Sequence, residues 1–79
     1  MRLEVVSNLI SFVGKKNEEA YAEKCLRLIG QELGFPVVDF FDNGDDEHMD
    51  LGVAYDQKFY TVEECRQAWR TVKSDLKHS

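Results

Sequence analysis

A dense group of carboxylates is the part of this sequence with the clearest chemical potential. Between Asp39 and Asp56 the chain has seven acidic residues and no lysine or arginine, whereas the rest of its 79 residues holds eight acids and ten bases. The formal net charge of -5 therefore originates in this one segment. Its acids are Asp39, Asp42, Asp45, Asp46, Glu47, Asp50 and Asp56. Such a group fits a solvated loop that protects a strand edge, a cation site, or a surface that attracts a basic partner.

The order of the residues argues against the cation site. A calcium loop of the EF-hand type needs alternating Asp or Asn ligands, then a glycine, and a glutamate at its end. Here Gly44 interrupts the ligand order too early, between Asn43 and Asp45. His48 stands alone in a polar loop, where a histidine is usually solvated. We predict no metal ligand and no cofactor, and keep weak binding of a divalent cation as the third alternative.

A solvated loop is the default interpretation of such a charge run, and the functional hypothesis that we carry forward is a protein-binding surface. Carboxylates on a rigid hairpin imitate the regular negative charge of a phosphate backbone, and long-range attraction steers them to grooves rich in lysine and arginine. An exposed phenylalanine beside the acids suits an interface anchor. We therefore predict that these residues contact a larger protein: Asp39, Phe41, Asp42, Asp45, Asp46, Glu47, Asp50 and Asp56.

Catalysis has little support in this sequence. It contains no glycine-rich phosphate loop and no Gly-x-Ser-x-Gly elbow, and nothing pairs a cysteine with a histidine. Cys25 and Cys65 lie forty residues apart without a Cys-x-x-Cys spacing, so they predict neither a zinc site nor a redox motif. Both fall on apolar helix faces, which favours free thiols in a reducing cytoplasm, although one disulfide between them stays open. We predict a protein that is not an enzyme.

The elements that would position the acids follow from apolar periodicity. Residues 2–13 place their apolar side chains on about half of a helical wheel, and Gly14 offers a stop, so we predict a first helix there. A second helix is predicted over residues 18–33, ended by Gly34 and by Pro36, which cannot continue it. A third is predicted over residues 62–76, because Thr61 and Glu64 match a capping box.

Between the second and third helices the apolar period changes to two. The runs 37–41 and 49–55 predict an antiparallel hairpin around the acidic loop, and Phe59-Tyr60 predicts a short third strand that completes a meander. On the first of these strands Val37 and Phe41 point to one side, and Val38 and Phe40 to the other.

These elements predict one α+β domain over residues 1–79. It has two N-terminal helices, a small antiparallel hairpin or three-stranded meander, and a C-terminal helix packed on one sheet face. No apolar run is long enough to span a membrane, and the N-terminal residues do not form a secretory signal, so we expect a cytoplasmic protein.

The predicted function is that of a small acidic inhibitor or regulator, in a format like that of phage or mobile-element inhibitors, which docks its hairpin on a basic surface such as a nucleic-acid-binding site. Direct binding of nucleic acid is not expected. The alternative is a structural or assembly subunit, for example a homodimer, that self-associates through the exposed strand and the face of the first helix.

Overall fold

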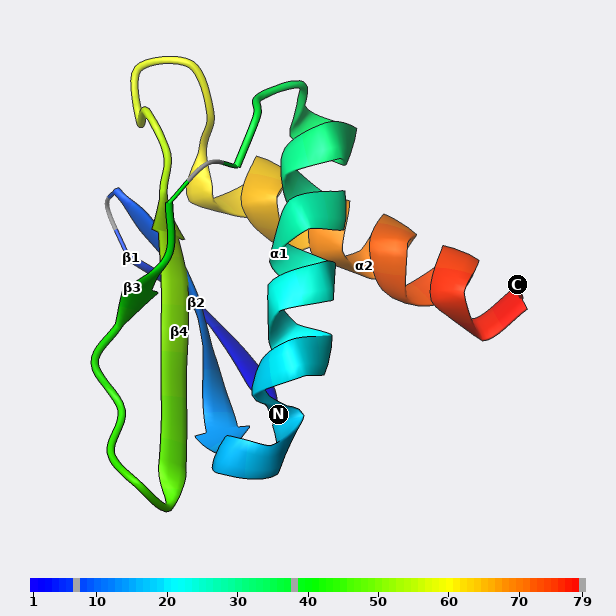
Figure 1. The fold of residues 1–79 in the computed structure, drawn as a ribbon. Coiled ribbons are helices and arrows are strands. Elements are labelled where there is room, and N and C mark those ends of the chain that lie inside the picture. The colour runs from blue at the N-terminus through cyan, green and yellow to red at the C-terminus, as the bar shows by residue number, and fades with distance from the viewer. Residues whose placement is uncertain (7, 38, 79) are drawn as a thin grey trace.

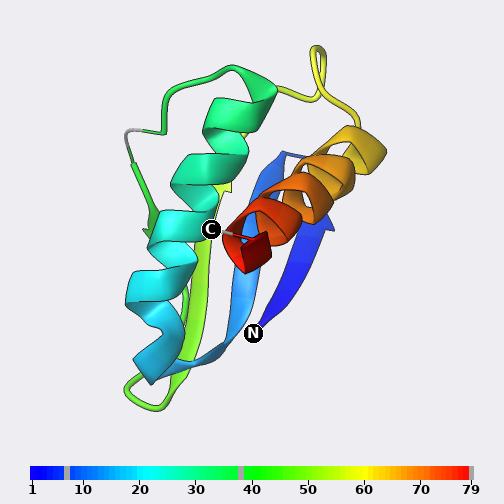
Figure 2. The same ribbon diagram turned by 90° about the vertical axis from the view of Figure 1, so that its right-hand side faces the viewer.

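The computed structural model describes residues 1–6, 8–37 and 39–78, which form a four-stranded antiparallel sheet with two helices on one face (Figures 1 and 2). The elements along the chain are β1 (Arg2–Val6), β2 (Leu9–Lys15), the 3-10 turn η1 (Lys16–Glu18), α1 (Glu19–Leu33), β3 (Phe41–Asp42), β4 (His48–Ala54) and α2 (Val62–His78). The strands lie in the order β1-β2-β4-β3. The fold is thus two consecutive units, each consisting of a hairpin followed by a helix.

The N-terminal segment corrects our first prediction, because residues 2–13 form the hairpin β1–β2 and not a helix. In its register Leu3 pairs with Phe12 and Val5 pairs with Ile10, and all four face the helices. The apolar positions satisfy both a helical and a two-residue period, and β-branched residues such as Val5 and Ile10 favour the strand. The prediction of two N-terminal helices is therefore wrong: the first of them is a hairpin, and the helix face that was to serve as an assembly surface does not exist.

The two observed helices match their predicted spans closely. α1 ends at Gly34, which adopts a left-handed conformation with φ 96° and donates its amide proton to the carbonyl oxygen of Gly30 at 2.8 Å. α2 begins with the predicted capping box: the Glu64 amide donates to Thr61 Oγ1 at 3.1 Å, and the Thr61 amide donates to Glu64 Oε1 at 3.3 Å. Local capping chemistry therefore sets both boundaries.

The second hairpin is present, but it differs from the prediction in two places. β3 is limited to Phe41–Asp42, which pair with Leu51 and Gly52 of β4. Phe59 and Tyr60 form a turn and not a third strand, because both amides donate to the carbonyl oxygen of Asp56, at 3.0 and 3.1 Å. The three-stranded meander is therefore wrong, and Val38 lies outside the described residues.

The core fills the space between the sheet and the two helices. α1 packs over β4 and β2, whereas α2 packs over β1, as Figure 2 shows. Phe12 is fully buried and meets the ring of Trp69 edge to face, with 4.9 Å between ring centroids. Cys25 and Cys65 are both buried and are not joined by a disulfide in the structure. Neither of the described helices combines the length and the apolar character that crossing a membrane requires.

Gly30 fixes the start of the segment that leads from α1 to β3. A Cβ atom at this position would lie 2.6 Å from Val37 Cγ2 and 2.9 Å from the Phe35 carbonyl oxygen. Glycine thus lets the chain after Pro36 pass close to the helix and reach the sheet edge. The position of β3 depends on this close approach.

Candidate functional site

The acidic residues lie on the β3–β4 hairpin and its flanks, which form one edge of the sheet (Figure 1). We call residues 39–56 the acidic hairpin. Four acids sit at its loop end, namely Asp42, Asp45, Asp46 and Glu47, and Asp50 lies in the middle of β4. Asp39 and Asp56 lie before β3 and after β4, at the other end of the hairpin. Six of the seven are exposed and Asp50 is half-buried. The structure therefore brings the predicted acids together on one accessible edge.

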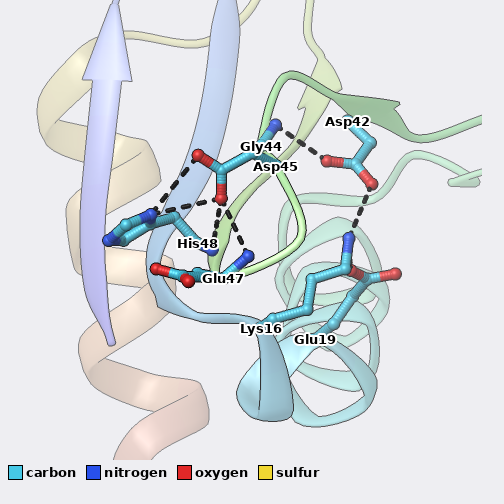
Figure 3. A network of polar contacts seen from close by, with 7 residues as sticks. All are labelled: Lys16, Glu19, Asp42, Gly44, Asp45, Glu47 and His48. Carbon is cyan, nitrogen blue, oxygen red and sulfur yellow. Dashed lines mark hydrogen bonds and ion pairs between the residues drawn. The ribbon is translucent and has the colours of Figure 1, made fainter.

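Two of the aspartates build the loop, as Figure 3 shows. Asp45 Oδ1 accepts the amide protons of Glu47 at 2.9 Å and of His48 at 2.7 Å, and the His48 ring nitrogen Nδ1 lies 3.2 Å away. Asp42 Oδ1 accepts the amide proton of Gly44 at 2.9 Å. Aspartate side chains that accept hydrogen bonds from nearby backbone amides in this way are typical of tight turns. Asp42 and Asp45 therefore hold the shape of the loop.

These hydrogen bonds also favour the ionised form of both carboxylates. The backbone amides of Glu47 and His48 hold the pKa of Asp45 below its usual value. For Asp42 the amide of Gly44 is the main cause of a lowered pKa, and the ammonium of Lys16 adds to it. Hydrogen-bond donors that bind a carboxylate stabilise its charged form and so lower its pKa.

Lys16 is the one lysine or arginine among the described residues that forms an ion pair with a carboxylate of the acidic hairpin. Its Nζ lies 3.4 Å from Asp42 Oδ2 and 2.7 Å from Glu19 Oε2. The hydrogen bond to Glu19, followed by the contact with Asp42, raises the pKa of Lys16. No sequence signal pointed to this pair, because 26 positions separate Lys16 from Asp42. This contact neutralises part of the negative charge at the loop end of the hairpin.

The remaining carboxylates keep their charge unbalanced. In the part of the chain that the structure describes, Asp39, Asp46, Glu47 and Asp50 form no ion pair. Asp56 uses Oδ1 to accept the Lys58 amide at 2.9 Å but is likewise not paired with a cation. β4 is seven residues long, so these charges follow an edge of about 20 Å.

The two phenylalanines of the hairpin have opposite surroundings. Phe40 packs against the core and carries the guanidinium of Arg27 over its ring, 5.0 Å from the centroid. Phe41 is 48% exposed and pairs with Gly52, on the sheet face that the helices leave open. Beside Phe41 and Asp39 lies a hollow of about 160 Å³. This volume is below that of ordinary ligand pockets, so the hollow suits a single side chain from a partner.

No group of three histidine, cysteine, aspartate or glutamate side chains within residues 1–6, 8–37 and 39–78 is arranged to hold a metal ion. The geometry therefore gives no support to the alternative of a divalent-cation module.

Comparison with known proteins found no match for this chain among protein-family models, curated protein sequences or solved structures.

Proposed function

We propose that this chain is a small regulator or inhibitor that binds a larger basic protein through the acidic hairpin. The observation that carries the proposal is the row of exposed carboxylates without ion pairs along one sheet edge. Asp50 lies in β4 and the other carboxylates lie at the two ends of the hairpin, so the folded backbone already positions them and less ordering is needed on binding. The two buried free thiols are in keeping with action in the reducing cytoplasm.

A basic groove that normally binds nucleic acid is the partner surface that fits this row best. Such grooves attract phosphates spaced along a backbone, and the hairpin offers carboxylates spaced along about 20 Å of strand. Its unbalanced field raises the rate of encounter with a positive surface, and salt weakens that attraction. Occupying the groove would prevent nucleic acid from entering it.

Phe41 and the hollow beside it supply the short-range part of the contact. A partner arginine in this hollow would place its guanidinium near the Asp39 carboxylate and its flat face near the Phe41 ring. Arginine suits such a site, because it pairs with carboxylates and stacks on aromatic rings. Replacing Phe41 with alanine should therefore speed dissociation more than it slows association.

The test is affinity capture with three immobilised proteins: the wild type, the hairpin variant D46K/E47K and the control variant E32K/D75K. Asp46 and Glu47 are exposed and make none of the hydrogen bonds that shape the loop through their side chains. Glu32 and Asp75 are exposed acids on α1 and α2, so the control changes the net charge by the same amount. Asp45 is left intact because its loss would distort the loop itself.

We expect the wild type and the control to retain a basic protein from a host extract, and the hairpin variant to lose it. Added duplex DNA should compete for the retained protein if its nucleic-acid site is the surface bound. Equal retention by all three proteins would refute the role of the hairpin.

A further inference from the structure

α2 carries a second charged surface, of opposite sign. Its members are Arg66, Arg70, Lys73 and Lys77, which we call the α2 stripe. Their spacing of four, three and four residues places them within one narrow arc of the helix, and all four are exposed. The stripe is about 16 Å long, given the rise of an α-helix. Two of its members have neighbours: Arg70 lies 3.4 Å from Glu63, and Lys73 lies 5.7 Å from the ring centroid of Trp69.

The α2 stripe and the acidic hairpin lie at opposite sides of the molecule. The side of α2 toward α1 carries Gln67 and Thr71, which line a hollow together with Glu32 and Leu33 of α1. Helical spacing therefore places the stripe on the side of α2 that faces away from α1. α2 packs over β1 (Figure 2), whereas the acidic hairpin lies at the β3 edge, at the other end of the strand order. The two surfaces therefore cannot meet within one molecule.

We propose that the α2 stripe is a binding site for the acidic hairpin of a second copy of this chain. The two surfaces are opposite in sign and similar in length, with about 16 Å of cations facing about 20 Å of carboxylates. Arg66 and Lys77 form no ion pair among the described residues, just as Asp46 and Glu47 form none, so each surface offers charge for the other. The inference shares the acidic hairpin with the proposed function but requires no other protein.

Contact between unlike surfaces makes the association head to tail. A bound pair still presents one free hairpin on one copy and one free stripe on the other, so the assembly grows with concentration unless it closes into a ring. Exposed ion pairs are individually weak and screened by salt, so the association is reversible and responds strongly to ionic strength. It also competes with the larger partner, because both occupy the same hairpin.

The test is sedimentation equilibrium of the full chain at about 0.01 M and about 1 M ionic strength, where the screening length is about 30 Å and about 3 Å. We expect the average mass of the wild type to rise with concentration at low salt, and the association constant to fall at least about tenfold at high salt. The hairpin variant D46K/E47K and a stripe variant R66E/K77E should each remain monomeric. An equimolar mixture of the two should associate again, because one keeps an intact stripe and the other keeps an intact hairpin.

Two control variants keep the outcome interpretable. E32K/D75K and K24E/K58E reproduce the two changes in net charge at exposed sites outside both surfaces, and they should associate like the wild type. A monomeric wild type at low salt, or a mixture that stays monomeric, would overturn the inference. So would binding of a duplex DNA probe by the wild type that is lost in R66E/K77E, because the stripe would then be a phosphate site.

Failure of this inference is distinguishable from failure of the proposed function. The stripe variant R66E/K77E keeps its acidic hairpin, so it should still capture the basic partner even if copies of the chain do not associate.

Discussion

Three alanine substitutions, at Val6, Ile10 and Val13, distinguish a hairpin from a helix in the N-terminal segment. On a helix these positions would lie on one face and respond alike, since they are four and three residues apart. In the structure they differ: Ile10 is fully buried against the helices, Val13 is half-buried on the open face of the sheet, and Val6 is 58% exposed.

The expected losses follow from these exposures. Ile10→Ala leaves a cavity in the core and should lower the free energy of unfolding by about 3 kcal/mol. Val13→Ala should lower it by about 1 kcal/mol and Val6→Ala by less than about 0.5 kcal/mol. A chain of 79 residues has a total stability of roughly 4 to 12 kcal/mol, so the first change removes a large share of it.

Urea unfolding followed by the fluorescence of Trp69 measures these losses, because this residue contacts Phe12 in the core and is the one tryptophan of the chain. The midpoint should fall in the order Ile10, Val13, Val6. Equal losses at the three positions would refute the hairpin and restore the helix.

Three further predictions test other parts of the structure. Gly30→Ala should lower the free energy of unfolding by about 1 to 3 kcal/mol, because the added Cβ would lie 2.6 Å from Val37 Cγ2, and this clash outweighs the better helix propensity of alanine. An unchanged urea midpoint would contradict this. Cys25 and Cys65 should react with iodoacetamide at neutral pH only after unfolding, because burial removes them from solvent and raises the pKa of both thiols. Mass spectrometry measures the labelling, and rapid labelling of the native chain would disprove this prediction. Because Asp42 and Asp45 have lowered pKa values in the folded chain, they stabilise it at pH values above 3.8, the usual pKa of aspartate, and this stabilisation is lost as the pH falls through the lowered values. The thermal midpoint should therefore stay constant near neutral pH and fall below about pH 4. An equal fall in D45N would assign the effect to other groups.

Elements with strong local signals could be predicted from the sequence. Gly34 and Pro36 end α1, and the pair Thr61 and Glu64 starts α2, because these residues act through chemistry within a few positions. β4 was also predictable from its strict alternation, with Met49 at the start of its buried positions.

The N-terminal hairpin could not be separated from a helix by periodicity alone. Its apolar residues are numerous enough to fit both periods, and the outcome depends on pairing with β4, which lies about forty positions later. The β-branched content of this segment, including Val5 and Ile10, was the signal that favoured strands.

The candidate site was predicted in its composition but not in its surroundings. Charge counting located the seven acids, and the alternation of the strand left open which phenylalanine would be exposed. The contact of Lys16 with Asp42, and the position of Arg27 over the Phe40 ring, depend on tertiary packing that no local pattern encodes. The structural role of Asp45 likewise became apparent only from its hydrogen bonds.

The most direct test of the acidic hairpin as a binding surface is the rate of association with the captured basic partner, measured by surface plasmon resonance over a range of salt concentrations. For the wild type and for E32K/D75K we predict fast association that slows steeply as salt rises, because the exposed carboxylates steer the encounter. For D46K/E47K we predict slow association with little salt dependence. Association of D46K/E47K at the wild-type rate, with the wild-type response to salt, would contradict the account.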